Sequence, residues 1–271
     1  MFRNTIRKAY PIIAVTLSVI LVCLVIIASC GPYNSIGLRE SPSGIRNNPP
    51  VDAFVVVSID TTVEPEACDP LTKACEKIIK ELPPIKSRKT GSGMKVWYEG
   101  KAFILTAEHV CSDDDEPTHF KYPEKDISIR LKIESRIQVT GVDGLAHDAT
   151  IAGMNKEMDL CALHVKGFKG GSVSLSVSPP RVGDTVYSIA APYGLGGESL
   201  SLVFEGRYSG FRRGMHYYTI PTRPGSSGAI VLNSSWQAIG SLHTAYVPLE
   251  SIGMGAGWSD LKLFLESLSQ H

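Results

Sequence analysis

The chain has 271 residues, of which 43% are hydrophobic and 20% are charged, and its 27 basic and 27 acidic side chains leave a formal net charge of zero. A chain of this length and composition can bury a sizeable core. The zero balance gives no electrostatic basis for binding nucleic acid, which requires a basic surface.

Residues 1–30 form a separate module. Basic residues within Met1–Lys8 precede an apolar run from Ile12 to Ala28, a pattern typical of an export signal or a membrane anchor. The run is short for a bilayer span, which needs about 20 residues. Ile27-Ala-Ser-Cys30 resembles the bacterial lipoprotein box, which favours lipidation of Cys30. A plain transmembrane anchor stays open. In either case we expect the basic end to stay cytoplasmic and the remainder to be exported and held at the membrane.

Residues 31–50 are rich in Gly, Pro, Ser and Asn and predict a flexible tether to a domain spanning residues 51–271. Within that domain, residues 61–90 form an apparent insertion. It contains Cys68 and Cys75, which could close a small disulfide loop outside the cytoplasm.

Short β-favouring runs separated by turn signals fill most of the domain. A dozen strands suits an all-β fold of two six-stranded antiparallel barrels with a cleft between them. Only the C-terminal segment Ser259–Leu268 has helical spacing, with Ser259 as a plausible N-cap. The expected strands are Ala53–Ile59, Met94–Tyr98, Ala102–Thr106, Ile127–Ile133, Ile137–Val142, Ala149–Ala152, Leu160–Val165, Thr185–Ala190, Leu202–Tyr208, Tyr217–Ile220, Ala229–Leu232 and Ala238–Leu242.

Three segments carry the parts of a Ser/His/Asp system, in the order His109, Asp159, Ser227. A serine hydroxyl is a weak nucleophile unless an imidazole takes its proton and a carboxylate orients that imidazole. His109 ends one buried strand and Asp159 begins another, so rigid elements would hold both side chains. A lone His, a lone Asp or a Gly-x-Ser-Gly turn is common, and the strength of the pattern lies in the three together.

Gly225-Ser-Ser227-Gly228 allows a sharp turn, because glycine tolerates backbone angles closed to other residues. In such a turn the N–H groups of Gly225 and Ser227 can converge on one point, which predicts an oxyanion hole.

The segment Val51–Leu268 resembles a trypsin-like serine protease domain. Its motifs are most similar to those of the HtrA and glutamyl endopeptidase branches. Gly91-Ser-Gly-Met94, Gly183–Leu195, Phe204–Arg207 and Ala238-Ile-Gly240 are similar to motifs of those families. The resemblance implies a serine endopeptidase with no cofactor, acting on proteins or peptides. Ser226 stands where trypsin has an Asp that pairs with a new N-terminus, so that form of activation is not expected.

The resemblance also suggests a substrate preference. Glutamyl endopeptidases and picornavirus-type proteases use a Thr and a His to hydrogen-bond a Glu or Gln before the scissile bond. Thr222 and His243 occupy comparable places in this chain, although the strand has one extra residue before His243. The alternative is that His243 lies on the rim of a pocket for small apolar side chains.

Two further sets of residues have plain interpretations. Cys111 and Cys161 each follow a predicted triad member by two positions, so they could lie near each other if those members meet, but two small core residues are favoured over a disulfide. No Cys/His spacing fits a metal site. The acidic run at residues 113–116 could take calcium, although a solvated loop is the more typical outcome.

We therefore expect an exported, membrane-tethered serine endopeptidase. A non-catalytic binding protein on the same fold is the alternative from another class. An esterase with the same chemistry is the second alternative.

Overall fold

The computed structural model describes residues 48–69, 73–112, 119–122, 127–246 and 249–270. The expected anchor, Cys30 and most of the tether lie outside these residues, as does the acidic run at 113–116. The compact unit begins at Asn48. Among the described residues, no helix combines the length and apolarity needed to cross a membrane.

Six antiparallel strands form the first barrel. They are β1 (Phe54–Asp69), β2 (Ile85–Tyr98), β3 (Lys101–Thr106), β7 (Leu160–Val165), β6 (Ala146–Asn155) and β5 (Ile127–Thr140), and pairing of β5 with β1 closes the ring. Two short strands join it: β4 (His119–Tyr122) pairs with β5, and β8 (Val173–Ser174) pairs with β2. The short helices η1 (Val51–Ala53) and α3 (Glu108–Cys111) flank β1 and β3 in sequence.

The second barrel contains β9 (Thr185–Ala190), β10 (Leu202–Arg212), β11 (Met215–Tyr218), β12 (Ile230–Leu232), β13 (Ala238–Ser241), β14 (Thr244–Tyr246) and β15 (Leu249–Gly255). β13 and β14 are successive halves of one path. β13 pairs with β12, whereas β14 pairs with β15, so the path closes the sheet. The N–H of Ser241 donates to the Ala256 carbonyl and that of His243 to the Met254 carbonyl, which joins the end of β13 and the link to β14 to the last residues of β15 and the residue after it. The 3-10 turn η2 (Pro192–Gly194) follows β9.

One apolar cluster joins the barrels and the C-terminal helix α4 (Trp258–Ser269). Phe54 and Leu105 of the first barrel, Ile230 of the second, and Leu261 and Leu265 of α4 all belong to it and are fully or almost fully buried. This shared core fixes the facing edges of the two barrels, where the predicted catalytic residues lie. The prediction of an all-β, trypsin-like fold with a C-terminal helix is confirmed.

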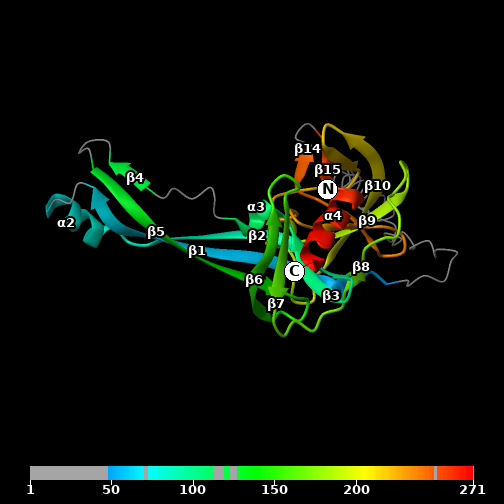
Figure 1. Ribbon diagram of the computed structural model, residues 1–271, viewed down its shortest axis with the longest axis horizontal. Helices are drawn as coiled ribbons and strands as arrows, with labels where there is room; N and C mark the ends of the chain where they lie inside the picture. The colour runs from blue at the N-terminus through cyan, green and yellow to red at the C-terminus, as the bar shows by residue number, and fades with distance from the viewer. Residues whose placement is uncertain (1–47, 70–72, 113–118, 123–126, 247–248, 271) are drawn as a thin grey trace, which may run out of the picture. The chain divides into compact units, whose positions relative to one another are not determined.

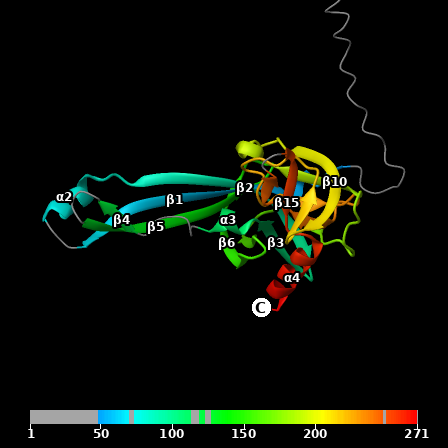
Figure 2. The same cartoon turned by 90° about the horizontal axis from the view of Figure 1, so that it is seen from above.

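The predicted insertion at 61–90 is mostly regular structure. β1, β2 and β5 continue beyond the barrel as a three-stranded ribbon, here called the arm, with α2 (Lys73–Glu81) at its tip (Figures 1 and 2). A disulfide joins Cys68 on β1 to Cys75 on α2. Cys75 and Ile129 are fully buried in a small cluster at this end, so the tip has its own apolar packing.

Several elements differ in length from the expected ranges, and for two of them the physical reason is clear. The runs 127–133 and 137–142 are one strand, β5, because its residues pair with β1 without a break between them. Helix α4 begins one residue before Ser259, and its N-terminus is capped differently: Asp260 Oδ2 accepts the N–H of Gly257 at 2.8 Å. A carboxylate in the first turn stabilises the free N–H groups of a helix start.

Candidate active site

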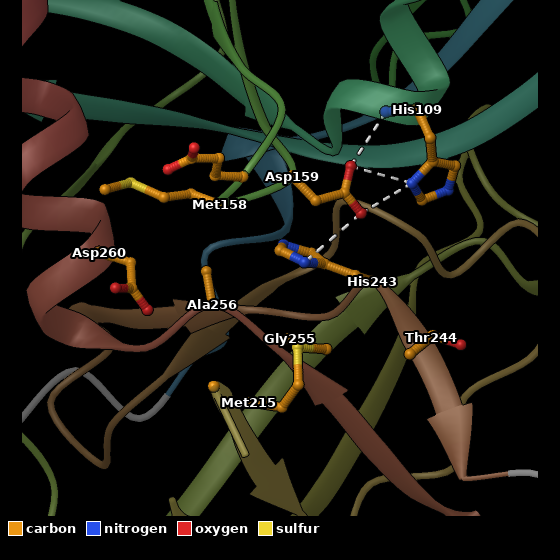
Figure 3. A pocket seen from close by; sticks show the side chains of 11 residues that line it. His109, Met158, Asp159, Met215, His243, Thr244, Gly255, Ala256 and Asp260 are labelled. Atoms are coloured by element: carbon orange, nitrogen blue, oxygen red, sulfur yellow. Dashed lines mark hydrogen bonds and ion pairs between the residues drawn. The ribbon is translucent and has the colours of Figure 1, made fainter. Parts of the chain in front are cut away.

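His109 lies on α3, the single helical turn that follows β3. Its imidazole Nδ1 is 2.8 Å from Oδ2 and 3.0 Å from Oδ1 of Asp159 (Figure 3). The same carboxylate accepts the backbone N–H of His109 at 3.0 Å. Asp159 therefore fixes both the imidazole ring of His109 and the backbone that carries it. With a carboxylate at Nδ1, Nε2 is left free to accept a proton.

Asp159 is presented by a tight turn between β6 and β7. Its φ of +49° lies in the left-handed region, which Asp tolerates better than most residues. The turn is closed by two bonds: the Met158 N–H donates to Asn155 Oδ1 at 2.9 Å, and the Asp159 N–H to the Lys156 carbonyl at 3.3 Å. The carboxylate is thereby held at the head of a buried strand, 25% exposed, facing the second barrel.

The electrostatics of this pair suit a general base. The hydrogen bond to Asp159 is the main reason that the pKa of His109 is raised, although partial burial opposes it. Burial raises the pKa of Asp159, but the hydrogen bonds from His109 and the electrostatic interaction with the His243 ring outweigh burial and leave that pKa lowered. Asp159 is therefore ionised at neutral pH, as an orienting carboxylate must be.

Ser227 lies in the turn before β12 and shares a pocket of about 500 Å³ with His109 and Gly225. Its Oγ donates to the backbone carbonyl of His243 at 3.0 Å, and within the described residues no hydrogen bond joins it to His109. Catalytic hydrogen bonds are often long or misaligned without substrate. A change of the Ser227 rotamer is the step that would redirect this hydroxyl.

The predicted oxyanion hole consists of the backbone N–H groups of Gly225 and Ser227. Gly225 has φ +91°, which strongly favours glycine. Neither its N–H nor that of Ser227 donates to a protein acceptor among the described residues. Two free donors beside the nucleophile can stabilise the negative charge of a tetrahedral intermediate.

Known proteins agree with this architecture. The sequence profile of the Trypsin-like peptidase domain matches residues 91–240, more than half of the chain. This chain belongs to the trypsin-like peptidase domain family. No curated protein sequence is similar enough to count as a match.

Solved structures show the same fold. The crystal structure of the serine endoprotease from Yersinia pestis superposes with a TM-score of 0.54 at 20% identity, over 80% of this chain and 63% of that one. This chain therefore spans less than two thirds of the Yersinia protein. The protein Rv3671c of Mycobacterium tuberculosis H37Rv, solved as a serine-to-alanine mutant in an inactive form, gives a TM-score of 0.54 at 13% identity, covering 85% and 94% of the two chains.

Thr222 and His243 have different polar partners, and among the described residues no hydrogen bond or ion pair joins them. Thr222 is buried and donates its hydroxyl to the Ile220 carbonyl at 3.2 Å. His243 is also buried, with Nδ1 3.5 Å from Asp159 Oδ2. A Cβ added at Gly253 would meet both the Thr222 hydroxyl and the Leu242 side chain, so Leu242 is the residue of this segment that lies beside Thr222. Successive side chains of an extended strand point to opposite sides, and the one extra residue before His243 turns it toward the triad.

Cys111 and Cys161 form a disulfide with a Cα–Cα distance of 6.5 Å, which corrects the expectation of two unlinked core residues. The bond connects the helix of His109 to the strand that follows Asp159. Their matched offsets, two positions after each triad member, were the signal that could have identified the pair. The other predicted pair, Cys68 and Cys75, is linked at the tip of the arm.

Sequence reasoning did not identify Ser92 as part of the site. Its N–H donates to the Ser227 carbonyl and its Oγ to the Gly225 carbonyl, both at 2.8 Å, while Oγ accepts the Ala191 N–H at 2.9 Å. Ser92 is fully buried, so these bonds are shielded from water. It fastens both ends of the Gly225–Ser227 turn to the first barrel. The described residues contain no group of three or more His, Cys, Asp or Glu side chains able to hold a metal ion.

Proposed function

We propose that this trypsin-like peptidase is a serine endopeptidase. Ser227 attacks the substrate carbonyl, His109 takes and returns the proton, and Asp159 orients His109. The N–H groups of Gly225 and Ser227 stabilise the oxyanion, and an acyl-enzyme on Ser227 is then hydrolysed by water. The observation that carries the proposal is the 2.8 Å contact of His109 Nδ1 with Asp159, in a residue that shares a pocket with Ser227 and Gly225.

The test uses the full-length protein, purified in mild detergent because of the apolar run at 12–28. The protein and its Ser227→Ala variant are incubated with a diverse peptide mixture, and cut sites are read by mass spectrometry. Cuts that depend on Ser227 support the proposal. Absence of cuts in the wild-type protein favours the alternative, a catalytically inactive or partner-activated binding protein. Turnover of ester but not peptide substrates favours an esterase.

The same data test the Glu/Gln preference. That preference stays a prediction from resemblance alone, since the side chain of His243 is turned toward Asp159. Ser227-dependent cuts concentrated after Glu or Gln would support it, whereas cuts after small apolar residues would contradict it.

We also propose that the peptidase is exported and held at the membrane through residues 1–30, by a lipid on Cys30 or by a transmembrane anchor. This rests on the basic flank, the apolar run and the Ile27–Cys30 box in the sequence. Fractionation of cells that express the wild-type protein and a Cys30→Ser variant tests it, with metabolic labelling by a palmitate analogue. Label that is lost in the variant supports lipidation, and unlabelled protein that stays with membranes supports the anchor.

A further inference from the structure

A second pocket, of about 410 Å³, lies on another side of His109, between the two barrels. The first barrel contributes His109 and the segment Glu157–Asp159 to its lining. The second contributes the turn between β10 and β11, the edge of β14, and the end of β15 with the first turn of α4. Figure 3 shows Asp159, His243 and Asp260 around this space. The pocket is within the range of small-molecule sites, about 300–1,000 Å³, and can hold one long side chain.

The charged groups in this lining are carboxylates. Glu157 is exposed, Asp159 is ionised, and the side chain of Asp260 is 30% exposed; none of the described Lys or Arg residues lines the pocket. The charge of Asp260 is partly offset by the helix start that it caps. His216 Nε2 lies 3.9 Å from it, but burial lowers the pKa of His216, so that ring adds little positive charge at neutral pH.

His243 supplies an independent indication. Its side chain is 5% exposed, and it lines the pocket from beneath Asp159 (Figure 3). Nδ1 faces the Asp159 carboxylate and therefore carries the ring proton, which leaves Nε2 as an acceptor. Nε2 is buried and has no partner among the described residues. An unpaired buried acceptor is costly, so a donor in this space would satisfy it.

Two methionines make the lining suitable for an alkyl chain as well. Met158 and Met215 line the pocket together with the carboxylates. Long cationic side chains place their methylenes along apolar surface while the charged end reaches polar groups. A lining of Met side chains and acceptor atoms therefore fits a Lys or Arg side chain better than a neutral or acidic one.

The route of the substrate brings such a side chain to this place. Among the described residues β14 has a strand partner, β15, on one side only, and its first residue, Thr244, lines the pocket. An extended peptide can add to a free strand edge. A peptide on β14 with its carbonyl at Ser227 passes His109, which borders both pockets.

We propose that this pocket is a specificity subsite for a lysine or arginine of the substrate, within three residues of the scissile bond on the side that pairs with β14. The proposal rests on the proposed endopeptidase function. Glu157 and Asp260 are the specificity-determining residues, and they act by contacting the cationic end of the substrate side chain.

The test compares peptide pairs that differ only by Lys or norleucine, a neutral side chain of similar length, at each of three positions on either side of the cut. The ratio of kcat/KM for Lys over norleucine is measured for the wild-type protein, Glu157→Gln, Asp260→Asn and the double variant. Because these charge pairs are partly exposed, each carboxylate should raise the Lys-over-norleucine ratio by a factor of about two to five. The ratio should approach one in the double variant. Glu205→Gln, exposed on β10 and outside the pocket lining, is the matched control and keeps the wild-type ratio. The preference weakens as salt rises.

A ratio near one at every position overturns the proposal, as does a preference unchanged in the double variant. Glu157→Gln is informative even if Asp260→Asn weakens α4, because Glu157 caps no helix. Calorimetric binding of the same peptides to Ser227→Ala, with and without Glu157→Gln, separates the two claims. Cleavage without a Lys preference refutes only the subsite. If the Lys peptide binds more tightly than the norleucine peptide, and this difference is lost in Glu157→Gln, but the wild-type protein cleaves neither peptide, then only the endopeptidase function is refuted.

Discussion

His243 Nδ1 lies 3.5 Å from Asp159 Oδ2, the same oxygen that His109 Nδ1 contacts at 2.8 Å. One carboxylate oxygen therefore faces two imidazoles, an exposed one from the first barrel and a buried one from the second. Burial lowers the pKa of His243 to about 4, so this ring is neutral at neutral pH and interacts with Asp159 as a dipole. Its backbone carbonyl holds the Ser227 hydroxyl, so His243 contacts two triad members.

Replacing Asp159 by Asn should lower kcat by about 10⁴, because an amide leaves the catalytic imidazole in the wrong tautomer. Single-turnover kinetics on a cleaved peptide measure the loss. Asp148→Asn is the control, since that carboxylate pairs with Arg136 at 2.7 Å on the exposed face of the first barrel. A loss of less than tenfold in Asp159→Asn would show that the His109–Asp159 contact does not serve catalysis.

The acid limb of the pH–activity profile should lie above the ordinary histidine pKa of about 6.5. Activity needs neutral His109, and its hydrogen bond to Asp159 raises its pKa, so protonation on acidification begins at a higher pH. The dependence of kcat/KM on pH reports this group in the free enzyme. In Asp159→Asn the limb should move to lower pH. A limb at or below 6.5 in the wild-type protein would contradict the assignment.

Stability should fall as the pH is lowered from about 6.5 to about 4, in part because of His243. In this window the unfolded chain protonates His243 while the folded chain keeps it neutral, so acid favours the unfolded chain. Urea unfolding at several pH values measures the slope. His243→Gln should flatten it, whereas His164→Gln, at an exposed site on β7, should not. Equal slopes in all three proteins would count against a buried neutral His243.

Removing the Cys111–Cys161 disulfide by double substitution to Ala should lower the free energy of unfolding by ~4 kcal/mol, from the entropy of a loop with a sequence separation of 50. The Cys68–Cys75 pair, with a separation of 7, should contribute ~2.5 kcal/mol on the same basis. Only the first pair joins the elements of His109 and Asp159, so only its loss should reduce kcat/KM. Denaturant unfolding and peptide kinetics on both double variants check this. Similar kinetic losses in both would refute the positioning role.

Gly225→Ala should reduce kcat by about 10²–10³, the usual effect of losing one oxyanion donor. A Cβ at this position would lie 2.5 Å from the Ala191 carbonyl oxygen and 2.8 Å from the Tyr193 nitrogen, so the turn must move. Gly100→Ala is the matched control, because it has a similar φ of +84° with no atom within 4 Å of the added Cβ. Equal activity in the two variants would argue against the oxyanion hole.

That His109, Asp159 and Ser227 would lie at one site could be predicted because each residue adjoins a short apolar strand whose type is evident locally. The side that a strand residue faces is harder to predict. His243 and Leu242 are neighbours with opposite orientations, and only the pairing of this segment with β12 and β15 decides which of them faces Thr222. Composition and spacing carry no information on that register.

The arm could not be predicted from the sequence for a related reason. β5 is exposed along much of its length, so between Ile133 and Ile137 its polar residues resemble a turn rather than a strand. Long-range pairing with β1 makes the segment a strand, and pairing partners are not visible in a single sequence. The role of Ser92 depends on its hydrogen bond to the Gly225 carbonyl, which lies 133 residues away in the sequence. Local sequence patterns do not reveal such a contact.

β2 runs without interruption from Ile85 in the arm to Ser92 beneath the nucleophile, and each of these residues has a fixed partner on β1. The same strand therefore sets which side each residue faces, both in the arm and at the active site. Inserting or deleting a single residue within 85–91 would turn the Ser92 hydroxyl away from Gly225. Changes of length at the tip, between β1 and β2, leave the pairing of β2 with β1 unchanged. The tip of the arm can therefore change in length without moving Ser92, whereas the part of β2 between the tip and Ser92 cannot.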